Sequence, residues 1–216
     1  MINYHRSDDI EEFLIYRELD GLDYEQLVDV IKPALSASVF GLLGNGFIDY
    51  FFKSVAHRGD SCIVGAFDGR DNLLGVAIAV MDHRDTYSSI MRKNWLRLAW
   101  KANFYLLRPA VLIWIIRGLF KSSDQSSCRG MENIDPRLLV ISVGSGCEKQ
   151  GIGSRLIDKV DEWFRSLNIP SYLIFTEKKN VGANRLYEKK GCEKLCIRNN
   201  RSKQIVVWVR HTNNTI

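Results

Sequence analysis

A buried strand, a glycine-rich turn and an amphipathic helix follow one another between residues 138 and 167, and this unit constrains the fold more than any other part of the chain. Residues 138–143 are a continuous, mostly apolar run, which predicts a central strand buried on both faces. The turn that follows leads into a helix over about 151–167, whose apolar stripe is Ile152, Leu156, Ile157, Val160, Trp163, Phe164 and Leu167. Such a strand and such a helix must pack in layers, which favours a mixed α/β domain.

The N-terminal quarter of the chain predicts further elements with helical spacing. Residues 2–6 are expected to form a short first strand, followed by a helix that begins near Asp8. A second helix over 24–31 is expected to end before Pro33, because proline cannot continue the hydrogen-bond ladder. The segment 46–55 is dense in Phe and Tyr, so we expect it to pack on the core or to line a pocket.

The remaining elements are mostly strands. Two apolar runs, 61–67 and 73–80, flank an Asp-Gly turn and predict a hairpin of buried strands. Further along the chain we expect a strand at 172–175, a helix at 180–189 and a final hairpin built from 194–197 and 204–209. No repeat or linker divides the sequence, so residues 1–216 are predicted to be one domain.

A basic, tryptophan-bearing segment at 84–130 separates the hairpin from the central strand. It has nine basic residues against two acidic ones, a net charge of +7, whereas the whole chain carries +5. Pro109 divides it into two expected helices. The basic face is either solvated, or covers an acceptor site, a homodimer contact or an anionic membrane surface, the solvated face being the commonest arrangement. Large apolar residues interrupt the basic ones, which argues against nucleic-acid binding.

The cysteines and the N-terminus point to a reducing cytoplasm. Met1–Asp9 lacks the apolar core of a signal peptide, and no stretch is long and apolar enough to span a membrane. The five cysteines are odd in number and have no paired spacing: Cys62, Cys128, Cys147, Cys192 and Cys196. The four histidines do not have the spacing of metal ligands, so no metal site is predicted.

The segment from Val143 to Ser154 has the chemistry of an anion-binding loop. Free N–H groups at a helix start and the positive end of the helix dipole favour a pyrophosphate, and glycines let the backbone approach it. A P-loop would need a lysine that Gly151-Ile152-Gly153 lacks. A dinucleotide-binding turn would need a third small residue where Leu156 stands.

A third phosphate-binding motif fits better. Glu148-Lys-Gln-Gly151-Ile-Gly153 resembles the acetyl-coenzyme A loop of the GNAT acetyltransferases, Arg/Gln-x-x-Gly-x-Gly/Ala, with an acidic residue at its first position. The run Asn180-Val-Gly-Ala-Asn-Arg-Leu-Tyr187-Glu-Lys-Lys-Gly-Cys resembles the same family's Asn-x-x-Ala-x-x-x-Tyr-Glu-Lys-x-Gly-Phe, with cysteine in place of the aromatic. The two motifs and the preceding strand mark residues 138–195 as an acetyl-CoA-binding core.

The resemblance also implies a fold. It implies a central mixed, mostly antiparallel sheet flanked by helices, with 61–80 as middle strands and 84–130 as a helical insert between the third and fourth strands. That insert is similar to the one in a subgroup associated with bacterial surface-polysaccharide biosynthesis.

The resemblance implies roles for individual residues as well. A neutral amine would attack the thioester of acetyl-CoA, and Tyr187 would protonate the leaving thiolate, since a phenol is protonated at neutral pH. The alternative for Tyr187 is a plain core residue. Asn180 would cap its helix and bind the pantetheine arm, and Val143 would offer its N–H to the acetyl oxygen. The cofactor-binding candidates are Ser142, Val143, Glu148, Lys149, Gln150, Gly151, Ile152, Gly153, Ser154, Asn180 and Ala183.

The base that accepts the amine proton has no clear sequence signature. Asp82, His83 and Glu177 are candidates, and ordered water is sufficient in principle. Cys147 lies beside the loop, but no histidine is near it in sequence, so a non-catalytic thiol is the simpler interpretation. We therefore expect an N-acetyltransferase that acts in a ternary complex on a primary amine of a small molecule, such as an amino sugar. The alternative is a non-catalytic acyl-CoA-binding or sensor module.

Overall fold

The computed structural model describes residues 14–20, 23–35, 44–102, 128, 130–131, 134–200 and 203–212. The strands are β1 (Ile15–Glu18), β2 (Ser61–Phe67), β3 (Leu73–Val80), β4 (Arg137–Val143), β5 (Ser171–Glu177), β6 (Glu193–Asn200) and β7 (Lys203–His211). The helices within these ranges are α1 (Tyr24–Leu35), α3 (Asn45–Ala56), α4 (His83–Ala102), α6 (Ile152–Ser166) and α7 (Val181–Lys189).

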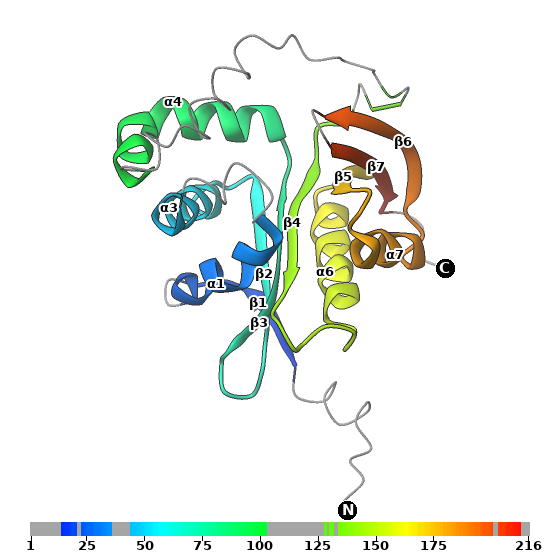
Figure 1. The fold of residues 1–216 in the computed structure, drawn as a ribbon, viewed down its shortest axis with the longest axis horizontal. Coiled ribbons are helices and arrows are strands. Elements are labelled where there is room, and N and C mark those ends of the chain that lie inside the picture. The colour runs from blue at the N-terminus through cyan, green and yellow to red at the C-terminus, as the bar shows by residue number, and fades with distance from the viewer. Residues whose placement is uncertain are drawn as a thin grey trace, which may run out of the picture.

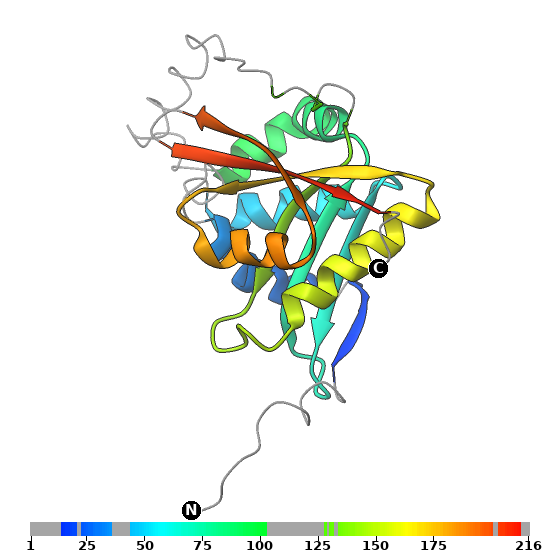
Figure 2. The ribbon, with the colours of Figure 1, turned by 90° about the vertical axis from the view of Figure 1, so that its right-hand side faces the viewer.

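One seven-stranded sheet organises the described residues, in the order β1-β2-β3-β4-β5-β7-β6 (Figure 1). Every neighbouring pair is antiparallel except β4 and β5, which run parallel. Helices α1, α3 and α4 cover one face of the sheet (Figure 1), and α6 and α7 cover the other, which faces the viewer in Figure 2. The predicted α/β fold with a mixed, mostly antiparallel sheet is confirmed.

The middle of the chain follows its sequence pattern closely. The predicted hairpin is β2 and β3, and α6 has buried Ile152, Leu156, Ile157, Val160 and Phe164 along one side. The aromatic segment 46–55 lies within α3 and is packed in the core under the sheet. Helix α4 lies between β3 and β4, where the insert is expected, whereas residues 103–127, including Pro109, lie outside the described residues. Among the described residues, no helix is both long and apolar enough to cross a membrane.

Strand β4 differs from the sequence prediction in its burial. Its residues alternate between half-buried and buried, instead of being buried on both faces. The reason is its neighbour: β4 and β5 pair only at Arg137 with Leu173 and at Leu138 with Ile174. Beyond these positions β5 leaves β4 and continues beside β7, so the rest of β4 faces an opening and not a packed strand.

Two N-terminal predictions need correction. The strand at 2–6 and the helix start near Asp8 lie outside the described residues, but the chain that follows is a strand, β1, which the sequence analysis did not predict. Helix α1 continues through Pro33 to Leu35. The hydroxyl of Ser142 donates a hydrogen bond of 2.6 Å to the carbonyl of Val30, one turn before the proline. A side-chain donor on β4 thus binds a helix carbonyl in the turn that proline disturbs.

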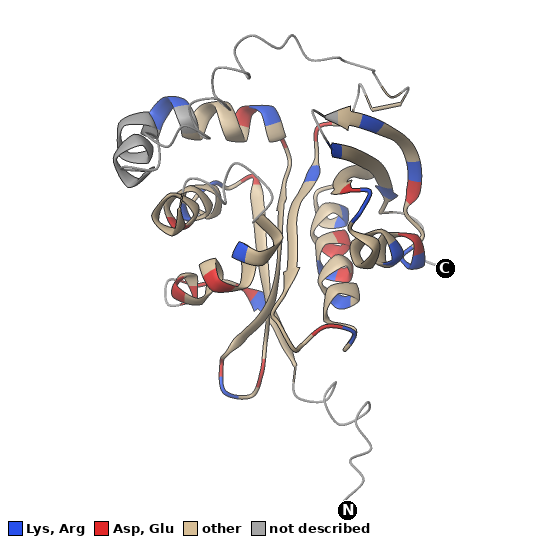
Figure 3. Ribbon diagram, viewed as in Figure 1, with Lys and Arg blue, Asp and Glu red and all other residues tan. Residues whose placement is uncertain are grey.

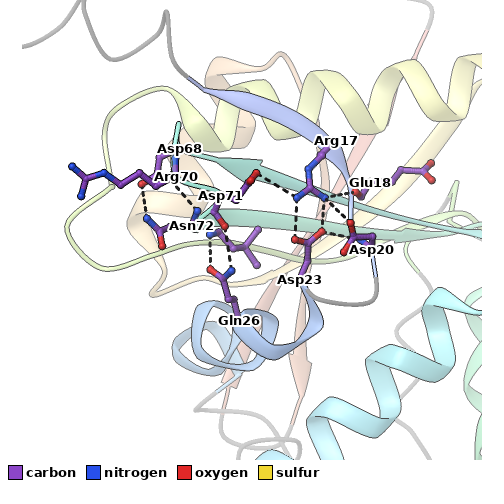
Figure 4. Close-up of polar contacts among 10 residues, drawn as sticks. Arg17, Glu18, Asp20, Asp23, Gln26, Asp68, Arg70, Asp71 and Asn72 are labelled. Atoms are coloured by element: carbon purple, nitrogen blue, oxygen red, sulfur yellow. Dashed lines mark hydrogen bonds and ion pairs between the residues drawn. The ribbon is translucent and has the colours of Figure 1, made fainter.

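Figure 4 shows what fixes β1 in place. Arg17 on β1 forms two hydrogen bonds with the buried carboxylate of Asp23, at the start of α1, and its guanidinium lies 3.9 Å from the ring centre of Phe67. Gln26 donates to the carbonyl of Asp71 (3.2 Å) and accepts from the N–H of Leu73 (2.7 Å). These contacts bind β1, α1 and the β2–β3 turn together, and they give Arg17 a partner that a helical pattern does not reveal.

The cysteine prediction is also wrong in one respect. Cys128 and Cys196 form a disulfide that joins the segment before β4 to β6, 68 residues away in sequence. Cys62, Cys147 and Cys192 are free thiols. The two bonded cysteines meet in a small apolar cluster under β5 and β7, and only the tertiary fold brings them together.

Candidate active site

A cleft of about 510 Å³ lies where β4 and β5 separate. Residues 138–141 of β4 line one side, and residues 174–177 of β5 line the other. The last turn of α1 closes it on one face of the sheet. From the turn before α7 and from α7 itself come Lys179, Asn180, Ala183 and Tyr187. The structure therefore brings the second predicted motif to the edge of the predicted central strand.

The cleft edge of β4 presents unpaired backbone groups. Gly144 donates its N–H to the carbonyl of Leu74 on β3 over 2.7 Å. Because N–H groups alternate in direction along an extended strand, those of Val143 and Ile141 point to the opposite edge. There β5 has already moved away. The N–H of Val143 thus points to the edge that β5 has left, although the cleft itself is lined by residues 138–141 of β4.

The loop after β4 ends in an uncapped helix start. Gly151 is the N-cap of α6 in a left-handed conformation (φ 81°), and no side chain caps the first turn. Helix-start N–H groups without partners are the usual anion site of such loops. Gly146 and Lys149 also have positive φ, 86° and 64°. Lys149 is exposed, so its ammonium is free to approach a phosphate.

Glu148 folds back on this loop. Its carboxylate accepts a hydrogen bond of 2.8 Å from the N–H of Gly146, and the Gln150 amide lies 3.4 Å from the Gly146 carbonyl. The acidic residue at the first motif position therefore occupies one loop N–H itself. The N–H groups that remain for a phosphate near the loop are those of the first turn of α6, which includes the half-buried Ser154.

Three other cofactor candidates offer no side chain to a ligand. The hydroxyl of Ser142 is buried against α1. Ile152 is 1% exposed and belongs to the core. A Cβ on Gly153 would lie 3.2 Å from Leu186 of α7, so the lack of a side chain at this position allows α6 and α7 to pack closely. These residues can meet a ligand only through their backbone.

Tyr187 lies in the cleft with its hydroxyl unpaired. The side chain is 3% exposed, and its ring centre is 6.2 Å from that of Trp208. Among the described residues, nothing hydrogen-bonds to its hydroxyl. Burial raises the pKa of Tyr187 above its ordinary value, so the phenol remains protonated and can donate a proton.

Asparagines hold the start of α7. Asn180 is its N-cap, and the side-chain oxygen accepts from the N–H of Ala183 over 3.1 Å. Asn184, which the sequence analysis passed over, donates to the carbonyls of Asn180 (2.7 Å) and Glu177 (3.1 Å) and accepts from the Trp208 indole (3.2 Å). Asparagine is a poor helix former, so its presence inside a short helix was the signal that could have identified Asn184.

The three base candidates are poorly suited to take a proton. Asp82 caps α4 by accepting from the N–H of Asp85 over 2.8 Å. Burial, with the charge of Arg137, lowers the pKa of His83 to about 4. Glu177 lines the cleft, but hydrogen bonds from Lys203 and then Lys179 outweigh burial and lower its pKa. Within the described residues, no group of side chains could hold a metal ion.

Comparisons with known proteins give a family segment and a fold. Residues 126–192 match the model of the acetyltransferase (GNAT) family. The fold resembles a ribosomal-protein-S18-alanine N-acetyltransferase from Escherichia coli (11% identity, 94% of this chain and 98% of that one, TM-score 0.57). It also resembles Arabidopsis thaliana NAA60 in complex with acetyl-CoA (15%, 93% and 99%, 0.58) and spermidine/spermine N-acetyltransferase SpeG from Vibrio cholerae (12%, 94% and 95%, 0.55). No curated protein matches the chain in sequence.

Proposed function

We propose that this chain is a GNAT-type N-acetyltransferase that moves the acetyl group of acetyl-CoA to a primary amine of a small molecule; its fold and the family segment at residues 126–192 support this. One observation carries the proposal. The only parallel pair of the described sheet, β4 and β5, separates after two residue pairs, and the opening is lined both by an unpaired strand edge and by Tyr187. An extended acyl carrier can add to that edge as a strand would.

The residues of the loop, of β4 and of α7 have separate roles in the proposed acetyl transfer. The uncapped first turn of α6, with Gly151 to Ser154, holds the pyrophosphate, and Lys149 and Gln150 contribute from the loop. The N–H of Val143 stabilises the oxyanion that forms when the amine attacks the thioester carbonyl. The carbon–sulfur bond then breaks, and Tyr187 gives its proton to the departing thiolate. Water accepts the amine proton, because Asp82, His83 and Glu177 are each engaged or weakly basic.

The acceptor and the setting are further parts of the proposal. The matched folds include enzymes named for a ribosomal-protein alanine and for spermidine or spermine, so peptide N-termini and polyamines join amino sugars as acceptor classes to test. The small-molecule class is favoured because α1 closes the cleft on one face. An amino sugar would also suit the insert's likeness to the polysaccharide-associated subgroup. We place the enzyme in the cytoplasm, acting without nucleic acid.

Three measurements test the activity. Isothermal titration should detect acetyl-CoA binding, and release of the coenzyme A thiol should follow addition of one acceptor from a panel of glucosamine, spermidine and an alanine-first peptide. Tyr187→Phe should lower that release by about 10²- to 10⁴-fold with little change in melting temperature, because the hydroxyl has no partner to lose. Tyr24→Phe, in the buried part of α1, is the matched control and should retain full turnover.

A non-catalytic acyl-CoA sensor is the second candidate, and a specific contact favours it. The carboxylate of Glu148 accepts a hydrogen bond from a loop N–H that would otherwise be free to bind a phosphate. In addition, none of the described base candidates is well suited to accept the amine proton. The sensor would bind acetyl-CoA without thiol release across the whole panel. Absence of acetyl-CoA binding would refute both candidates.

A further inference from the structure

Three arginines are close enough for their charges to interact near the start of β4, where one of them packs on the cleft wall. Arg137 begins β4, Arg84 lies in the first turn of α4, and Arg198 lies on β6. The charges of Arg84 and Arg198 both act on the guanidinium of Arg137. Figure 3, in the view of Figure 1, shows Lys or Arg segments on α4, β4 and β6 at the same end of the molecule.

Arg137 is directly connected to the cleft wall. Its guanidinium carbon lies 4.7 Å from the ring centre of Phe175, and Phe175 lines the cleft. A ring under the flat face of a guanidinium leaves the N–H groups at its edge to bind a planar or tetrahedral anion. The position is suited to recognising a second group on a molecule that occupies the cleft.

Two buried nitrogen atoms of this cluster lack a protein partner, whereas Nη1 of Arg198 lies 4.0 Å from the sulfur of Met131. The Nε of Arg137 and the Nδ1 of His83 are buried and have no hydrogen-bond partner among the described residues. Within the residues that the structure describes, no carboxylate forms an ion pair with Arg84, Arg137 or Arg198. A buried, unpaired guanidinium donor is costly, and native structures satisfy such groups with a ligand, water or ion.

Charge and distance both point to an anion other than the cofactor's phosphates. The charges of two further cations, Arg84 and Arg198, act on Arg137, against that of one carboxylate, Asp135. Arg137 and Val143 are the two ends of β4, about 20 Å apart at an extended-strand rise. The α6 start, which follows Val143, is therefore remote from this cluster.

We propose that Arg137, with Arg84 and Arg198, binds an anionic group, a phosphate or a carboxylate, carried by the amine acceptor. The inference rests on the proposed acetyl transfer and narrows its substrate class to amines with a negative charge. Bidentate hydrogen bonds from Arg137 fix the orientation of the acceptor, and the two outer arginines add attraction.

Direct binding tests the subsite without any catalysis. Protein saturated with coenzyme A, so that the α6 site is filled, is titrated with inorganic phosphate and, separately, with acetate. We expect a residual anion site in the wild type that Arg137→Met weakens about ten- to a hundredfold, while Arg137→Lys retains part of it. Arg70→Met, in the exposed β2–β3 turn, removes the same charge as a control and should have no effect. No residual site, or one unchanged by Arg137→Met, would overturn the proposal.

Turnover tests the link to the acceptor and identifies the anion. Matched pairs, glucosamine 6-phosphate with glucosamine and alanine with alaninamide, are compared by thiol release. Arg137→Met should raise KM for the phosphorylated or the carboxylated member about ten- to a hundredfold, with kcat and the KM of the neutral member nearly unchanged. Equal losses for both members of each pair would contradict the subsite. Failure of acetyl-CoA to bind would refute the proposed function alone. The phosphate titration is then run on the protein without coenzyme A, where Arg137→Met should still weaken one anion site, and no effect of Arg137→Met would overturn the subsite.

Discussion

A buried ion pair behind α7 offers a sharp test of how this site is supported. Asp161 of α6 is 3% exposed, accepts from the Tyr172 hydroxyl over 2.9 Å, and forms hydrogen bonds of 2.8 and 3.1 Å with the guanidinium of Arg210. Arg210 in turn donates to the carbonyl of Lys190, the C-cap of α7. One carboxylate thus links α6 and the β5–β7 strands to the helix that carries Tyr187.

Asp161→Asn keeps the shape of this side chain but removes its charge. The amide nitrogen would face the donors of Arg210, whose side chain is only 12% exposed, and would leave a buried cation without a counter-ion. Breaking a buried pair in this way costs about 3–5 kcal/mol. At about 2–4 °C per kcal/mol for a domain of this size, the melting temperature should fall by roughly 6–20 °C.

The control lies one turn earlier on the same helix. Asp158 forms an ion pair with Lys190, but its carboxylate is 44% exposed, so Asp158→Asn should cost about 1 kcal/mol or less. Calorimetry of both variants at one pH, with hydrogen exchange of the α7 amides, gives the comparison. The reasoning would be refuted if the two variants melted within about 2 °C of each other, or if exchange in α7 did not increase in Asp161→Asn.

Three shorter predictions follow. Burial raises the pKa of Asp23, but hydrogen bonds from the guanidinium of Arg17 outweigh this effect and hold the pKa below its ordinary value. The Arg17–Asp23 pair therefore stabilises the fold above about pH 4. As the pH falls further, urea unfolding should show that Asp23→Asn loses less stability than the wild type does. Gly75→Ala should lower stability by about 1–3 kcal/mol, because its Cβ would stand 2.9 Å from Ile152, whereas Gly59→Ala, with open space around it, should not change the urea midpoint. Since the pKa of His83 is about 4, His83→Gln should leave the shape of the pH–rate profile between about pH 5 and 8 unchanged, and loss of a limb there would identify His83 as the base.

The sequence prediction succeeded where one segment contains its own signal. The Asp-Gly turn and its flanking apolar runs produced the β2–β3 hairpin, and Asn180 caps α7 as its spacing indicates. It was wrong where a distant partner decides. Strand β1 depends on its pairing with β2, where Ile15 lies opposite Phe67, and the disulfide joins Cys128 to a residue 68 positions away. Neither partner is visible in a window of neighbouring residues.

The sequence by itself determined the strand–turn–helix unit, the positive φ at Gly151 and the motif that supplies Tyr187, because periodicity and glycine chemistry act over a few residues. The tertiary structure decided where β5 separates from β4, that the Tyr187 hydroxyl remains unpaired, and that Arg84, Arg137 and Arg198 converge. Strand pairing and side-chain burial depend on residues far apart in the chain. The motif that resembles an acetyl-CoA loop could therefore be recognised in the sequence, whereas the cleft and the arginine cluster exist only once the sheet has formed.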